Sequence, residues 1–134
     1  MACDIKDRGK NILLEYMDIL EIEDICAETN ENRILPLIFM GVISAVCEEA
    51  GIPETEHNEV IVYCLSKLLG QDIEATKEYV GQANVHISCD MNSFHAIAFC
   101  QGKNSYSDFL GGNTFAVFDE ITSIIDYIES EFFY

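Results

Sequence analysis

Apolar residues recur at helical spacing along most of the chain. Between about Lys10 and Ala27, for example, Leu13, Met17 and Leu20 share one helical face, while acidic residues lie on the opposite face. The same spacing, with cap residues such as Asp72 and Asn113, predicts four further helices. They cover about 56–69, 72–89, 94–101 and 113–132. Two alternatives remain for the end of the 94–101 helix: a loop from 102 to 107, or a continuation of the helix through Leu110.

The segment from Ile34 to Ala50 is apolar almost all round, with no charged residue before Glu48. A helix without a polar face belongs in the interior of a bundle. Pro36 suits the first helical turn, where its missing N–H costs little, and Gly51 and Pro53 are typical of a helix end. We therefore predict a buried central helix over about 34–50.

The pattern predicts one all-α domain spanning residues 1–134, a compact bundle of five to six helices. An α+β alternative stays open, because residues 85–100 can also be read as a short β-hairpin with alternating polar and apolar positions. The predicted core consists of Leu13, Leu20, Ile38, Val42, Val46, Ile61, Leu65, Val80, Ile97, Ile121 and Ile125.

Composition adds a strong charge asymmetry to this picture. The chain has 134 residues, of which 49% are hydrophobic, and 7 Lys and Arg against 24 Asp and Glu give a net charge of −17. Such a protein repels nucleic acid and anionic membranes. The residues 1–7 contain no apolar run and no segment is long enough to span a bilayer, so we expect a cytoplasmic protein whose six cysteines are free thiols.

No motif for catalysis or cofactor binding is found. His86, Cys89, His95 and Cys100 match no zinc spacing, and the negative surroundings disfavour an activated thiolate at either cysteine. EF-hand and phosphate-binding loops are absent, and the many paired carboxylates lie at helix ends and on polar faces. We expect no enzymatic activity, no metal and no cofactor.

Acidic residues gather in clusters that contain little or no Lys or Arg. Net charges of about 2–8 suffice to keep a small domain soluble, so the excess points to a cationic protein partner. The first predicted binding surface, which we call the acidic corner, consists of Glu48, Glu49, Glu54, Glu56 and Glu59. The second consists of Glu21, Glu23, Asp24 and Glu28. The aromatic tail 132–134 is a further candidate anchor.

Length, acidity, free cysteines and helical pattern together resemble a class of proteins, the small all-helical immunity proteins of bacterial toxin systems. The resemblance implies a non-catalytic protein that neutralises a cognate toxin by covering a basic surface. Two alternatives remain open: a cytosolic secretion chaperone or adaptor for an effector protein, and an inhibitor that mimics nucleic acid. The oligomeric state is left undetermined.

Overall fold

The computed structural model describes residues 2–22 and 30–133, with side chains described for 5–22 and 34–133. The described residues form six α-helices and no strand. The helices are α1 (Ala2–Leu20), α2 (Asn30–Glu49), α3 (Glu54–Leu69), α4 (Ile73–Cys89), α5 (Phe94–Leu110) and α6 (Thr114–Phe132).

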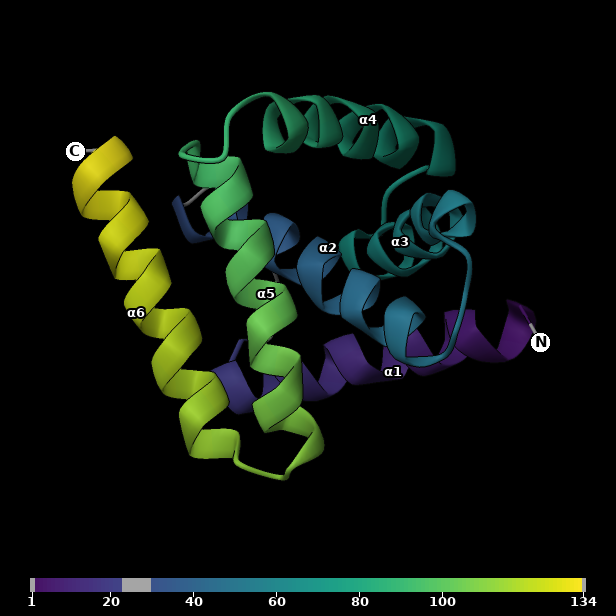
Figure 1. Cartoon of the computed structure of the whole chain (residues 1–134), viewed down its shortest axis with the longest axis horizontal. Helices are drawn as coiled ribbons and strands as arrows, with labels where there is room; N and C mark the ends of the chain where they lie inside the picture. Colours follow the sequence, from purple (N-terminus) through teal and green to yellow (C-terminus); the bar gives the residue numbers. More distant parts are fainter. Residues whose placement is uncertain (1, 23–29, 134) are drawn as a thin grey trace.

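The helices wrap around α2. Figure 1 shows α5 crossing α2, with α6 antiparallel to α5 on its outer side and α1 running along the base of the molecule. Helix α3 packs between α1 and α2, and α4 follows as a cover over one edge. In the part of the chain that the structure describes, no helix combines the length and apolarity that crossing a bilayer demands.

The all-α prediction is confirmed for the described residues, and the hairpin alternative at 85–100 is wrong. Helix α4 continues to Cys89, and α5 begins at Phe94, where Ser93 caps it by accepting a hydrogen bond from the N–H of Ala96 at 3.1 Å. The alternation around Val85 that resembled a strand reflects a helix end with little burial, since Val85 is 60% exposed.

Three predicted helix boundaries were wrong. Helix α1 begins at Ala2 rather than near Lys10, and it ends at Leu20 rather than Ala27 because Glu21 adopts a left-handed φ of 60° and Ile22 bonds back to the carbonyl of Met17. Helix α2 begins at Asn30 rather than Ile34, so Pro36 lies in its second turn and not in its first. Of the two alternatives left open for the end of α5, the continuation through Leu110 is the correct one. The caps at Asp72 and Asn113 are confirmed.

Helix α2 is the buried centre of the bundle, as its composition predicted. From Ile34 to Cys47 every side chain is buried except the half-buried Ala45. All the predicted core residues are buried except Ile97, which is partly buried against the core. The hydrophobic pattern therefore identified the inward faces of most helices.

The tightest contact in the fold is the crossing of α2 and α5. A Cβ atom on Gly41 would collide with the carbonyl oxygen of Phe99, and one on Gly102 would collide with the carbonyl oxygen of Ile38. The two backbones touch here because both residues lack a side chain. This explains why the helix continues through Gly102, where the sequence left a loop open.

A buried polar contact lies one turn beyond the crossing. The hydroxyl groups of Tyr16 and Ser105 are 2.9 Å apart, and Ser105 also donates to the carbonyl of Gly102 at 2.8 Å. The Tyr16 ring stacks on Phe109 at 4.9 Å between centroids. Through Tyr16, α1 is fixed against the same side of α5 that carries the small residues.

The glycine crossing leads to a prediction on stability. Gly41→Ala should lower the free energy of unfolding by at least about 2 kcal/mol, because the added methyl group meets backbone that has no rotamer to change. Gly81→Ala is the matched control: it lies inside α4, a Cβ there meets nothing within 4 Å, and the substitution should raise stability by up to about 1 kcal/mol. Urea unfolding measures both. If Gly41→Ala and Gly81→Ala changed the free energy of unfolding equally, the close crossing of α2 and α5 would be contradicted.

Buried thiols lead to a second prediction, on alkaline pH. Burial raises the pKa of Cys47 to about 11 and that of Cys64 to about 12. In the unfolded chain these thiols ionise at about pH 8.5, at lower pH than in the folded protein. Thiol ionisation therefore leaves the free energy of unfolding unchanged below that pH and lowers it as the pH rises toward 11–12. Unfolding followed from pH 8 to pH 11 should show this fall, flattened in a Cys47→Ala/Cys64→Ala variant. If the free energy of unfolding of this variant falls with pH as steeply as that of the native chain, groups other than these two thiols cause the fall.

Candidate functional site

The acidic corner lies where α2 ends and α3 begins. Glu48 and Glu49 are the last two residues of α2, and Glu54, Glu56 and Glu59 lie in the first turns of α3. All five side chains are exposed. The five carboxylates therefore surround the junction of α2 and α3, where Glu48 and Glu54 line one hollow and Glu59 lines another.

Cations from distant parts of the chain pair with three of these carboxylates. Lys103 of α5 contacts Glu48 at 2.7 Å, and Lys6 of α1 contacts Glu59 at 3.2 Å. Glu49 pairs with Arg8 and also accepts a hydrogen bond from the hydroxyl of Tyr106 at 2.9 Å.

The expectation that this cluster lacks neutralising cations was therefore wrong. The partners lie 41 to 55 residues away along the chain, where no local reading of the sequence finds them. Among the described side chains, Glu54 and Glu56 have no ion-pair partner. The free charge of the corner is smaller than its sequence indicated.

The second predicted cluster lies mostly outside the described residues. Glu23, Asp24 and Glu28 belong to that part, and nothing is said of their placement. Glu21 is exposed immediately after α1, three residues beyond Asp18. The described member of this cluster thus continues an acidic edge that begins on α1 itself.

Exposed apolar side chains gather beside that edge, where α1 meets the turn between α5 and α6. Two adjoining shallow hollows of about 480 and 410 Å³ share Asp18, Ile19 and Thr114. Phe115 is 77% exposed. We call this region the acidic–apolar surface. It is lined by Glu15, Asp18, Ile19, Phe109, Leu110, Thr114, Phe115 and Phe118.

The fold builds this surface from two parts of the chain that contain no Lys or Arg; another such part, residues 34–66, holds the acidic corner. Residues 11–32 hold seven acidic and no basic residues, and residues 104–134 hold six acidic and no basic residues. Neither Glu15 nor Asp18 has an ion-pair partner among the described side chains. Asp119 is exposed one turn after Phe115, on the same side of α6.

A pair of neighbouring carboxyl groups, Asp108 of α5 and Glu120 of α6, links these two helices. Burial, together with the neighbouring carboxyl group of Asp108, raises the pKa of Glu120 above its ordinary value. The Oε2 atom of Glu120 is buried without a hydrogen-bond partner among the described residues. Neither Asp108 nor Glu120 has an ion-pair partner among the described side chains, unlike Glu48, Glu49 and Glu59 of the acidic corner.

Sequence reasoning missed this surface as a unit. Phe115 falls outside the apolar stripe of α6, and nothing local indicates that α1 and α6 meet. The absence of Lys and Arg from residues 11–32 and 104–134 is visible in the sequence, but residues 34–66 lack them as well, so that absence alone does not single out this surface. Of the aromatic tail, Phe132 and Phe133 pack on the ring of Phe94, and Tyr134 lies outside the described residues.

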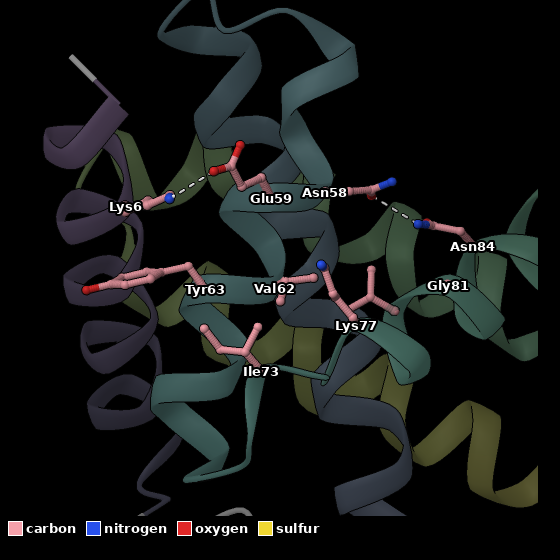
Figure 2. Close-up of a pocket in the computed structure, with 10 residues that line it drawn as sticks. Lys6, Asn58, Glu59, Val62, Tyr63, Ile73, Lys77, Gly81 and Asn84 are labelled. Carbon is pink, nitrogen blue, oxygen red and sulfur yellow. Dashed lines mark hydrogen bonds and ion pairs between the residues drawn. The ribbon is translucent and has the colours of Figure 1, made fainter. Parts of the chain in front are cut away.

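A groove of different character lies between α3 and α4, near the start of α1. It measures about 500 Å³, and Val62 and Val80 form its buried floor. Figure 2 shows Lys6 and Tyr63 on the side of α1 and the 3.0 Å hydrogen bond between Asn58 and Asn84 on the opposite side. The remaining lining residues are Glu59, Ile73, Lys77 and Gly81.

The histidines and exposed cysteines form no metal centre in the described part of the chain, where no group of three or more metal-binding side chains converges. The rings of His86 and His95 stack with centroids 4.4 Å apart. Burial and the neighbouring His86 lower the pKa of His95. Cys89 and Cys100 are free and exposed.

Three comparisons were made with known proteins, and none finds a relative. Neither the family models, nor the curated proteins, nor the solved structures match this chain.

Proposed function

We propose that the protein is a non-catalytic binding protein that holds a basic protein partner on its acidic–apolar surface. The observation that carries this proposal is the position of Phe115, an aromatic ring 77% exposed among carboxylates without cations. Exposed apolar patches with a polar rim are typical of protein–protein contact sites.

The two kinds of residue in this surface would serve different parts of association. Carboxylates at the rim attract a cationic partner and raise the rate of encounter. A ring that becomes fully buried in the complex contributes more to residence time, because aromatic anchors carry much of the binding energy in protein interfaces. Phe115 and Leu110 supply that apolar centre, and Glu15 and Asp18 supply the rim.

The chemistry of the occupant follows from this arrangement. A basic segment with one apolar face, such as an amphipathic helix rich in lysine, complements an apolar centre surrounded by carboxylates. A protein that mimics nucleic acid needs rows of carboxylates, which an exposed aromatic centre interrupts. We therefore place a protein partner first, with a bacterial toxin as its first candidate and a secreted effector as the second.

The acidic corner takes a secondary part in this proposal. Glu48, Glu49 and Glu59 are engaged by cations of the same chain. Glu54 and Glu56 remain available to attract a cationic partner over the screening length of about 8 Å at physiological ionic strength.

A defined peptide tests the surface. An amphipathic Leu/Lys helix should bind with an association rate that falls steeply with salt, and a matched Leu/Glu helix should not bind. Phe115→Ala should raise the dissociation constant of the Leu/Lys helix by about tenfold or more, chiefly through faster dissociation. Glu15→Gln/Asp18→Asn should slow association instead.

The matched control is Glu54→Gln/Glu56→Gln, which removes the same charge from the acidic corner. Its effect on the association rate should be the smaller of the two. Stopped-flow fluorescence provides the rates, and circular dichroism verifies that each variant is folded. If Phe115→Ala binds as the native chain does, or if the corner variant is the more impaired, the acidic–apolar surface is not the docking site.

A cell assay tests the toxin assignment separately. A toxin encoded beside the gene for this chain should arrest bacterial growth, and co-expression of this chain should restore it. Phe115→Ala combined with Asp18→Asn should fail to restore growth, whereas the corner variant should succeed. Neighbouring genes without any toxin would overturn the immunity assignment and leave peptide binding at the surface as a distinct result.

A further inference from the structure

Gly81 is an exception among the glycines that lie inside helices. Gly9, Gly41 and Gly102 each lie where a Cβ would press on a neighbour, whereas a Cβ on Gly81 would meet nothing within 4 Å. Its φ angle is not positive, so the backbone does not require glycine. A glycine inside a helix costs about 1 kcal/mol relative to alanine. Contacts within the described chain give no reason for that cost.

The place of Gly81 supplies a reason. It lies on α4 in the wall of the groove between α3 and α4, close to Lys77, Val80 and Asn84 in the helical register. Glycine in such a wall lets a ligand approach the helix backbone closely. Ile73, 47% exposed, extends the apolar floor made by Val62 and Val80.

Two of the seven Lys and Arg residues, Lys6 and Lys77, line the groove in a chain of net charge −17. Lys67 lies outside the lining, 5.5 Å from the centre of the Tyr63 ring. Lys6 is paired with Glu59, but the nearest carboxylate to Lys77 is Glu74 of the same helix, at 4.0 Å.

We propose that this groove binds a small amphipathic carboxylate. Its apolar body would lie on Val62, Ile73 and Val80 across Gly81, and its carboxylate would pair with the ammonium group of Lys77. A volume of about 500 Å³ falls within the usual range of small-molecule sites, which are mostly apolar with a few polar groups that fix orientation. The proposal is independent of partner binding at the acidic–apolar surface.

Decanoate is a suitable probe, with decanol as the matched neutral molecule and decyltrimethylammonium as the cationic one. Decanoate should give saturable shifts in the backbone amide of Gly81 and in the side-chain amides of Asn58 and Asn84, with a dissociation constant of ~0.1–10 mM for a ligand of this size. Decanol should bind more weakly, and decyltrimethylammonium weakest of all. Heteronuclear NMR titration measures all three.

Two variants and one control variant separate the apolar and the ionic part of the site. Lys77→Met should weaken decanoate several-fold and leave decanol unchanged, while Lys67→Met, outside the groove lining, should change neither. Gly81→Leu should abolish binding of both molecules by filling the groove, and the higher helix propensity of leucine protects the fold.

Three results would overturn the proposal. They are the absence of saturable shifts with decanoate, equal binding of the three probes, and native affinity in the Gly81→Leu variant. Phe115→Ala should bind decanoate as the native chain does, so failure of this site and failure of the protein-docking surface are distinguishable.

Discussion

The close crossing of α2 and α5 is the constraint on which the rest of the structure depends. It requires glycine on both helices, since Gly41 faces the backbone of α5 and Gly102 faces the backbone of α2. Side chains of any other kind would separate the helices and open a gap in a core that packs to crystal-like density. The crossing also holds α5 straight through to Leu110, so that α6 returns antiparallel along it (Figure 1).

The acidic–apolar surface is a consequence of this crossing. Ser105, one turn beyond Gly102, meets the hydroxyl of Tyr16 and brings the second half of α1 against the end of α5. The turn at 111–113 then starts α6 beside α1, which leaves Phe115 and Phe118 over Asp18 and Ile19. A contact buried inside the molecule thereby determines which charges and rings meet on its exterior.

Local patterns were enough to predict most helices, because caps and apolar periodicity act over a few residues. Asp72, Ser93 and Asn113 start helices as their side chains indicated, and the apolar composition of α2 predicted its central place. Features that depend on distant segments were missed. The pairing of Arg8 with Glu49 and the approach of α1 to α6 follow from tertiary packing, which one-dimensional spacing does not encode. The same packing decides between the two alternatives that the sequence left open for the end of α5.

A need for solubility could explain the total net charge. It does not explain where the acidic residues lie. Of the 24 acidic residues, 13 belong to residues 11–32 and 104–134, two stretches without Lys or Arg, and the fold brings parts of these two stretches together instead of separating them. Repulsion between uncompensated carboxylates opposes folding. A protein that needs only solubility gains nothing from concentrating such carboxylates in one place. The same chain pairs Glu48, Glu49 and Glu59 with its own cations. An acidic surface that is left unpaired and also displays Phe115 is better explained by a cation supplied from outside the chain.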